Sequence, residues 1–140
     1  MANGADIETL ARLALFAGLS RPQLERIAHT YDEELFPEGQ RILRKGLSGS
    51  GLYVVLDGQA SVVLDGKGEI ARLGRGEFFG EVSALLGGAP TADVIAASSL
   101  RCLVVPGPDV ESFLLANPPV LLAMLKAEAM RLSETLEWKG

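Results

Sequence analysis

The segment that decides the fold runs from Gly74 to Ala92 and reads GRGEFFGEVSALLGGAPTA. It interrupts a series of short apolar runs, and it predicts a strand, a tight turn at Gly80 and one turn of helix beginning near Glu81. The free N–H groups and positive dipole end of a helix start favour an anion. Glu81 is well placed there, and its carboxylate could accept hydrogen bonds from a ligand hydroxyl.

The chain around this segment, from Glu34 to Val105, has the period-two pattern of β-strands. Asp-Gly pairs at 57–58 and 65–66 are typical of hairpins, because glycine readily takes the positive φ that such turns need. Many short strands at this spacing predict an antiparallel β-roll or jelly roll. The apolar runs that mark these strands are residues 35–36, 41–43, 52–56, 60–64, 69–73, 92–97 and 100–105.

Helical spacing flanks the strands on both sides. Ile7, Leu10, Leu13 and Ala14 predict a first helix, and a capping box of Ser20 with Gln23 predicts the start of a second. Two more helices are expected after the strands, one ending before residues 117–119 and a longer one over 120–138. We therefore expect an α+β fold, mainly β, in one domain over residues 1–140, with N-terminal helices in 1–33, a β-roll in 34–106 and C-terminal helices in 107–140.

Composition and charge argue against several classes of protein. The 140 residues carry a formal net charge of −5 and no basic patch, which disfavours direct contact with nucleic acid or an anionic membrane. The N-terminus does not have the pattern of a signal peptide, and no apolar run approaches the roughly 18 residues of a membrane helix. The single cysteine cannot form an internal disulfide. We expect a soluble, cytoplasmic protein.

The remaining reactive side chains do not indicate catalysis or metal binding. His29 is the one histidine, and the spacing of a metal site or catalytic triad is missing around it. Cys102 alternates with apolar residues in a strand, so we expect a buried structural thiol. The sequence predicts a non-enzymatic protein with neither catalytic nor metal-binding residues.

Taken together, these segments resemble the cyclic-nucleotide-binding domain family of bacterial catabolite activators and protein kinase A regulatory subunits. The resemblance covers almost the whole chain. Residues 15–28 resemble the leading helices of the family, and the glycine-marked run from Gly39 to Gly58 resembles its β-roll. Phe79-Gly80-Glu81 matches its phosphate-binding cassette, over residues 74–92. The resemblance implies a bacterial signal-transduction domain that senses a ligand.

The resemblance also implies a set of ligand-binding residues. Glu81 would bind the ribose 2′-hydroxyl, and the N–H groups of Val82 and Ser83 would bind the cyclic phosphate. Thr91 stands where some members have a phosphate-contacting threonine, and Thr135 stands about where bacterial regulators have a base-contacting one. The complete set is Phe79, Gly80, Glu81, Val82, Ser83, Pro90, Thr91, Ala92 and Thr135.

One position departs from the family pattern. The cassette arginine that pairs with the phosphate falls on Pro90, and the sequence has no arginine between Gly76 and Leu100. A charge-assisted hydrogen bond contributes roughly 1.5–3 kcal/mol, so its loss weakens phosphate binding by roughly ten- to a few-hundred-fold. Arg72, Arg75 or Arg101 could substitute if the fold brings one of them to the site.

Two functions stay open on this basis. The domain is either a sensor of cAMP, cGMP or a related phosphate-bearing ligand, or a nucleotide-free homologue that serves as a structural or protein-interaction module. A spacing near 3.5 recurs along the last helix, at Leu121, Leu125, Glu128, Leu132 and Thr135 or Leu136. Although Glu128 interrupts the apolar series, this spacing predicts either a dimer seam or packing of the helix on the roll.

The chain ends at Gly140 without a helix-turn-helix. We therefore expect a stand-alone sensor or a regulatory segment of a longer protein, and the acidic charge makes the sensor half of a DNA-binding regulator the less favoured alternative.

Overall fold

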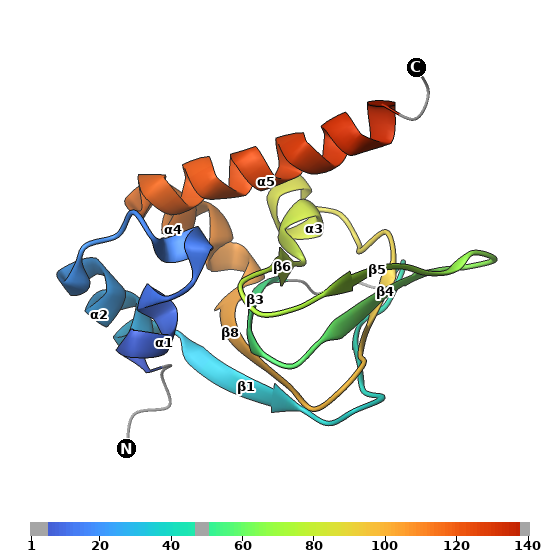
Figure 1. Cartoon of the computed structure of the whole chain (residues 1–140), viewed down its shortest axis with the longest axis horizontal. Coiled ribbons are helices and arrows are strands. Elements are labelled where there is room, and N and C mark those ends of the chain that lie inside the picture. The colour runs from blue at the N-terminus through green and yellow to red at the C-terminus, as the bar shows by residue number, and fades with distance from the viewer. Residues whose placement is uncertain (1–5, 47–50, 138–140) are drawn as a thin grey trace.

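The computed structural model describes residues 6–46 and 51–137, with side chains described up to residue 134. The helices from the two ends of the chain lie together on one side of a β-roll (Figure 1). The N-terminal helices are α1 (Ile7–Ala11), the short 3₁₀ helix η1 (Ala14–Phe16) and α2 (Arg21–Thr30). The strands are β1 (Asp32–Phe36), β2 (Arg41–Leu43), β3 (Gly51–Asp57), β4 (Ala60–Leu64), β5 (Gly68–Leu73), β6 (Phe78–Phe79), β7 (Asp93–Ala96) and β8 (Leu100–Pro106). The other helices are α3 (Glu81–Leu86), the 3₁₀ helix η2 (Gly107–Asp109), α4 (Val110–Ala116) and α5 (Pro118–Glu137).

The strands form two antiparallel four-stranded sheets. One sheet has the order β1-β8-β3-β6 and the other has the order β2-β7-β4-β5. Neighbours in these sheets are distant in sequence: Glu34 of β1 pairs with Cys102 of β8, and Val62 of β4 pairs with Val94 of β7. The predicted antiparallel β-roll with flanking helices is confirmed.

The N-terminal helices follow the prediction in part. The capping box is present: the Ser20 side chain accepts from the Gln23 N–H, and the Gln23 side chain accepts from the Ser20 N–H. The first helix is shorter than its apolar spacing predicts, because Leu13 has extended backbone between α1 and η1. This break turns Leu13, Leu15 and Phe16 all into the core, which a continuous helix would not allow.

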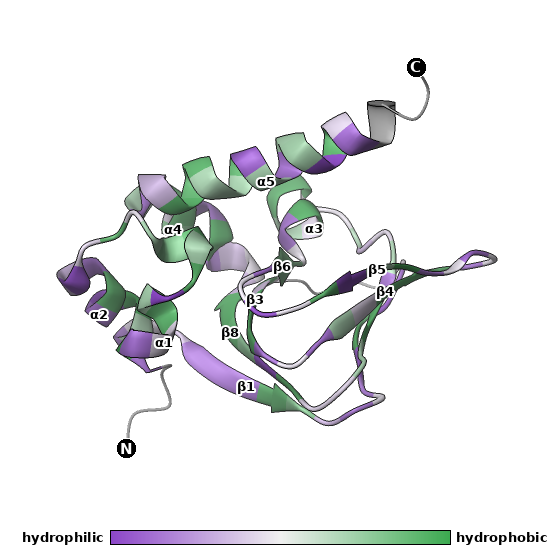
Figure 2. Ribbon diagram, viewed as in Figure 1, coloured by the Kyte–Doolittle hydropathy of each residue, from purple (hydrophilic) through white to green (hydrophobic). Residues whose placement is uncertain are grey.

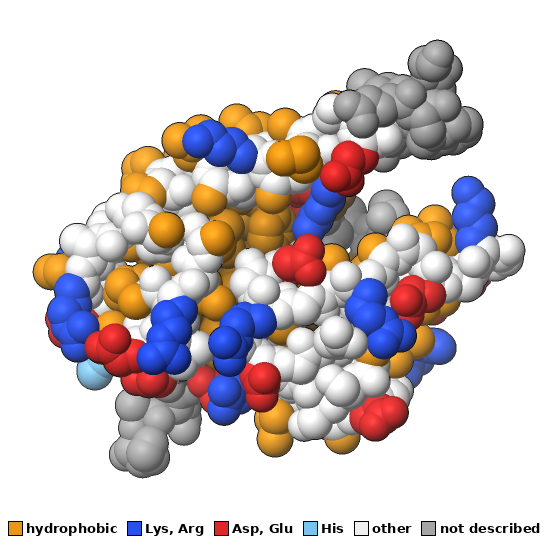
Figure 3. All heavy atoms as spheres, viewed as in Figure 1, with side chains coloured by type: hydrophobic (Ala, Val, Ile, Leu, Met, Phe, Trp, Pro, Cys, Tyr) orange, Lys and Arg blue, Asp and Glu red, His pale blue; other side chains and the backbone are white. Residues whose placement is uncertain are grey.

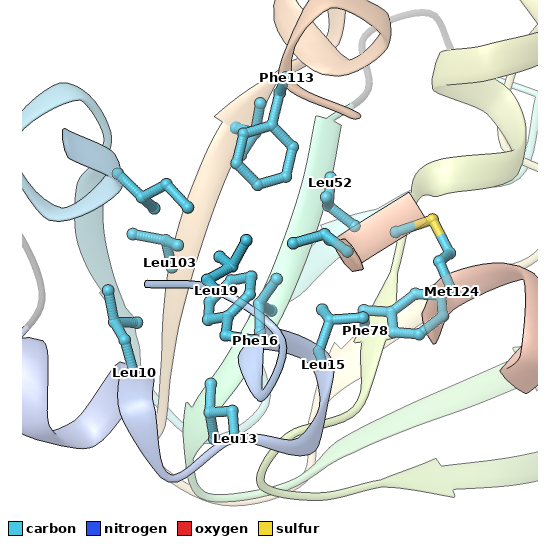
Figure 4. Close-up of a cluster of buried hydrophobic side chains, with 14 of the residues drawn as sticks. Leu10, Leu13, Leu15, Phe16, Leu19, Leu52, Phe78, Leu103, Phe113 and Met124 are labelled. Atoms are coloured by element: carbon cyan, nitrogen blue, oxygen red, sulfur yellow. The ribbon is translucent and has the colours of Figure 1, made fainter. Parts of the chain in front are cut away.

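One hydrophobic core lies between the helices and the β1-β8-β3-β6 sheet. Figure 4 shows side chains from both ends of the chain meeting there, with Leu10 and Phe16 on one side and Phe113 and Met124 on the other. Leu52 and Leu103, on the neighbouring strands β3 and β8, form the floor of this core. Long-range contacts therefore fix α5 relative to the roll.

A second core lies between the two sheets. It includes Val55, Phe79, Leu100 and Cys102, and Cys102 is fully buried as predicted. Burial, together with the nearby charge of Glu34, raises the pKa of the Cys102 thiol to about 12. The thiol stays protonated at neutral pH and acts as a small apolar side chain.

The C-terminal helices meet at the predicted proline pair. α4 ends at Ala116 and α5 begins at Pro118, because proline is tolerated in the first turn of a helix. Figure 2 shows apolar and polar residues alternating along α5, which lies across α3 and α4. Within the described residues, no single helix is long and apolar enough to cross a membrane. Only the segments 107–116 and 118–134 taken together reach that length and apolar composition, and they are bent by 109° relative to each other.

Candidate functional site

The cassette is held in place by a glycine that no other residue can replace without strain. Gly80 follows β6 with a φ of +88°, and an added Cβ there would collide with the backbone carbonyl of Gly51 on β3. Positive φ and this close approach both favour glycine. The turn directs the chain into α3, which begins at Glu81 as the sequence predicts.

A cavity of about 230 Å³ lies against this cassette. Its walls come from the cassette, from apolar residues of β2, β4, β5 and β7, and from α5. Eight of the nine sequence-predicted residues line it: Phe79, Gly80, Glu81, Val82, Ser83, Pro90, Thr91 and Ala92. The ninth, Thr135, belongs to α5, but its side chain lies outside the described residues.

Glu81 is the buried acid of the site. Its side chain lines the cavity and the residue is only 4% exposed. Burial raises the pKa of Glu81 to about 8, and hydrogen bonding with the neighbouring Glu128 carboxyl and the charge of Glu128 act in the same direction. The charge of Arg131 acts the other way but does not prevail. The Glu81 carboxyl therefore carries a proton over much of the neutral range.

Arg131 brings a positive charge to the cavity from the C-terminal helix. Its Nη1 lies 4.0 Å from Glu81 Oε2 and 3.1 Å from Glu128 Oε1. Its guanidinium also lies over the Phe78 ring, 5.1 Å from the centroid, which is cation–π geometry. Among the described residues that line the cavity, Arg131 is the one cation.

Glu128 and Arg131 were not predicted at the site from the sequence. The predicted seam included Glu128, whereas in the structure Glu128 pairs with Arg131, which also approaches Glu81. The signal that would have found them is their spacing: with Met124 and Ala127, which pack on the core, they share the buried stripe of α5. A charged Glu-x-x-Arg pair on a buried helix face indicates a polar partner opposite.

The three arginines offered as substitutes lie elsewhere. Arg72 pairs with Glu69 at 2.8 Å on β5, and Arg101 pairs with Glu33 at 3.4 Å across β8 and β1. Arg75 donates to the carbonyl of Leu56. None of these three side chains lines the cavity.

The rest of the cassette is held by backbone contacts. Pro90 is buried, and its carbonyl accepts from the N–H of Gly46 at 3.0 Å. Asp93, just after the cassette, accepts from the Lys45 N–H at 2.7 Å and lies 3.9 Å from Arg41. Asp93 therefore fixes β2 and does not line the cavity.

The other reactive residues do not form a second site. His29 is exposed on α2, and the described residues hold no group of three or more histidine, cysteine or acidic side chains that could bind a metal ion.

Comparison with known proteins agrees with this geometry. Residues 33–117 match the family described as the cyclic nucleotide-binding domain. The chain is 34% identical, over 113 residues, to the cGMP-dependent protein kinase egl-4 of Caenorhabditis briggsae. The matched region covers 76% of this chain and 15% of the kinase.

Solved structures are similar over almost the whole chain. The regulatory subunit of a cAMP-independent protein kinase A from Trypanosoma brucei has a TM-score of 0.78 and 26% identity, covering 95% of this chain and 49% of that one. A variant of that subunit with three substitutions, one of which replaces a threonine by an arginine, is bound to cAMP in its A site (TM-score 0.77, 25% identity, 95% and 49% covered). The catabolite activator protein of Thermus thermophilus has a TM-score of 0.77 and 29% identity, covering 89% of this chain and 61% of that one. The chain thus spans 15% of the kinase and about half of the trypanosomal subunit.

Proposed function

Because the chain belongs to the cyclic-nucleotide-binding domain family, we propose that it is a regulatory domain that senses a small ligand in the cassette cavity. The ligand is cAMP, cGMP or a related phosphate-bearing molecule. The observation that carries this proposal is Glu81, a buried carboxyl that lines the cavity and is contacted from α5. A buried polar group of this kind is retained where it has a specific partner.

The cavity supports a division of roles for such a ligand. The carboxyl of Glu81 is available to a ribose hydroxyl, and the N–H groups of Val82 and Ser83 are the proposed phosphate donors. Apolar walls from Leu43, Val62 and other strand residues would cover the base. The ligand would act on α5 because Arg131 touches both the cavity and Glu81.

Weak affinity for cyclic nucleotides is part of the proposal. The cassette supplies Pro90 where the family has its arginine, and the cation that lines the cavity, Arg131, is already beside two carboxyl groups. The trypanosomal relative is named a cAMP-independent kinase subunit, and the form bound to cAMP has gained an arginine. We infer that the missing cassette arginine, at Pro90, limits cyclic-nucleotide affinity here.

A second candidate function rests on a different observation. The outer face of α5 exposes Leu122, Leu125, Ala129 and Leu132, which alternate at spacings of three and four residues. Hydrophobic side chains lie along this helix in the space-filling view (Figure 3). We propose that this stripe mediates self-association, either together with ligand sensing or, if the cavity binds nothing, as the domain's interaction surface.

We further propose that the domain is non-catalytic and cytoplasmic. The acidic and basic side chains described at the cavity, Glu81 and Arg131, contact one another, with Glu128 alongside. The cavity offers no nucleophile paired with a base among its described residues. The single, buried Cys102 is consistent with a reducing compartment.

Titration calorimetry with cAMP and cGMP up to millimolar concentration tests the sensing function. We expect a saturable heat for at least one nucleotide, and Glu81→Ala should reduce the affinity by about tenfold or more, because it removes a hydrogen bond to the ligand. Glu111→Ala, an exposed change on α4, is the matched control and should leave the affinity unaltered. Absence of heat and of any thermal shift with both nucleotides would overturn the sensing function.

A further inference from the structure

A second cavity, a groove between α5 and η1, lies beside the cassette cavity. Its volume is about 440 Å³, against about 230 Å³ for the cassette cavity. Its walls come from three parts of the chain that are distant in sequence, namely η1, the turn before β6, and α5. Among the described residues, only Phe78 and Arg131 line both cavities. The groove is therefore a separate candidate site, of a size typical for a small molecule.

Small and apolar side chains shape this groove. Ala123 and Ala127 are one turn apart on α5, and their short side chains leave space between α5 and η1. Leu15 of η1 and Phe78 of β6, which Figure 4 shows next to each other, are buried and form the floor. Met130 is 63% exposed at the edge, where its flexible thioether can adapt to the shape of a ligand. The groove therefore offers an elongated apolar surface along α5.

One cation at the edge of the groove, Lys126, is exposed and makes no ion pair with any described residue. The other charged side chains there differ from it. Arg131 pairs with Glu128 at 3.1 Å, and Glu77 accepts a backbone N–H of its own turn at 2.8 Å. Glu134 lies eight residues after Lys126, about 12 Å further along the helix. The end of the groove at Lys126 therefore favours an acidic group.

We propose that this groove binds a small amphipathic acid, with its carboxylate at Lys126 and its aliphatic chain over Ala127 and Met130. A medium-chain fatty acid has this chemistry. A single acidic end fits better than two, because an acid at the other end would approach Glu134. The site goes beyond the proposed function, since it needs neither Glu81 nor a nucleotide.

The aliphatic chain and the carboxylate contribute to the affinity by different amounts. Each buried methylene strengthens binding about fourfold, so decanoate, which is two methylenes longer than octanoate, should bind roughly four- to fifteenfold more tightly. An ion pair with the exposed Lys126 contributes less, about two- to fivefold. The two contributions can be measured separately, the first by changing the chain length and the second by removing the charge.

NMR of the full chain with isotope-labelled methionine methyl groups locates the ligand. Met130 lines the groove and Met124 is buried in the core, so their signals report on the ligand and on the fold respectively. Met130→Leu assigns the signal. Sodium octanoate, at millimolar concentrations below those at which it forms micelles, should shift the Met130 signal to saturation and leave that of Met124 nearly unchanged. Decanoate should do so at a roughly four- to fifteenfold lower concentration.

A charge-neutral variant of Lys126 tests the carboxylate contact. Octanoate should bind roughly two- to fivefold more weakly to Lys126→Gln, while uncharged octanol should bind this variant and the parent chain equally. Lys67→Gln, an exposed change in the turn between β4 and β5, is the matched control and should bind both molecules as the parent does. Equal octanoate affinity in Lys126→Gln and the parent would overturn the proposed carboxylate contact.

Three other outcomes would overturn the site itself. The first is a Met130 signal that neither acid moves. The second is an equal shift of the Met124 signal, because the acid would then act on the fold. The third is a Met130 signal that moves with protein concentration and not with octanoate, because a second copy of the chain would then cover the groove. None of these results bears on the cassette cavity, which calorimetry with cAMP and cGMP tests separately.

Discussion

The carboxyl of Glu81 on α3 and the guanidinium of Arg131 on α5 lie 4.0 Å apart, at the edge of the cavity that the cassette lines. The site is therefore composite: the β-roll supplies its walls and acid, and the C-terminal helix supplies its cation. A ligand that displaced either side chain would alter the contacts of α5, because Glu81 and Arg131 both line the cavity and contact each other. We propose that this shared contact couples ligand binding to the position of α5.

The stability of the domain should depend on pH through Glu81. The pKa of this carboxyl is about 8 in the folded chain, against 4.5 for an ordinary glutamate, so the folded state binds the proton more tightly. The resulting stabilisation is fully present below about pH 4.5 and is lost as pH rises through 8. Urea unfolding at intervals from pH 5 to 9 should show the free energy of unfolding falling over that range.

The contribution of Glu81 is isolated by comparing variants. Glu81→Gln cannot titrate, so its free energy of unfolding should fall less steeply with pH than that of the parent chain. Glu111→Gln, exposed on α4, should keep the parental slope. Parallel slopes for the parent and Glu81→Gln would contradict the raised pKa.

The local pattern of the sequence was enough to predict the roll and the cassette. Glycine after most of the strands, the capping box at Ser20 and the FGE turn are local signals, and each appears where it was expected. The break at Leu13 was missed because three apolar residues from η1 and its flank enter the core only when the helix stops. Tertiary packing decided that boundary, and intrinsic spacing did not.

The cation of the site was not predicted from the sequence because its position depends on a long-range contact between α5 and the roll. The arginines predicted from the sequence as substitutes, Arg72, Arg75 and Arg101, lie outside the cavity, whereas the cation that lines it comes from α5. The register of that helix on the roll is set by Val120 and Met124 in the core, and this register turns Glu128 inward and Leu125 outward. Periodicity alone defined several possible stripes, and packing selected one of them.

Two glycines with the same backbone conformation offer a test of the cassette turn. Gly39 and Gly80 have φ of +91° and +88°, but an added Cβ meets nothing within 4 Å at Gly39 and collides with the Gly51 carbonyl at Gly80. Gly39→Ala should cost about 1–2 kcal/mol from backbone strain alone. Gly80→Ala should cost at least about 1 kcal/mol more, measured by urea unfolding. Equal losses would mean that the close approach to β3 contributes nothing.

Self-association through α5 can be tested by charging its exposed stripe. Leu125 and Leu132 are 61% and 60% exposed, so replacing both by glutamate should not disturb the core. Sedimentation of the parent chain should show a dimer that Leu125→Glu with Leu132→Glu dissociates. Leu115→Glu, on α4 and 67% exposed, is a control of matched chemistry and should remain dimeric. A parent chain that stays monomeric at every concentration would remove this candidate function.

Restoring the cassette cation should strengthen nucleotide binding. Pro90 lines the cavity where the family has its arginine, and the cation supplied by α5 is already paired with Glu128 at 3.1 Å. Pro90→Arg should therefore lower the dissociation constant for cAMP or cGMP by roughly ten- to a few-hundred-fold, the worth of one charge-assisted hydrogen bond. Calorimetry on the parent and the variant under the same salt measures this factor.

A second arginine variant separates a specific contact from a general gain of charge. Leu86 is 81% exposed at the end of α3 and does not line the cavity, so Leu86→Arg adds the same charge near the cassette without reaching the ligand. Its effect should stay within about a factor of two and should vanish in high salt. The gain in Pro90→Arg should persist in salt because that side chain pairs with the phosphate inside the cavity. A Pro90→Arg chain that binds no better than Leu86→Arg would mean that the lost arginine is not what limits affinity.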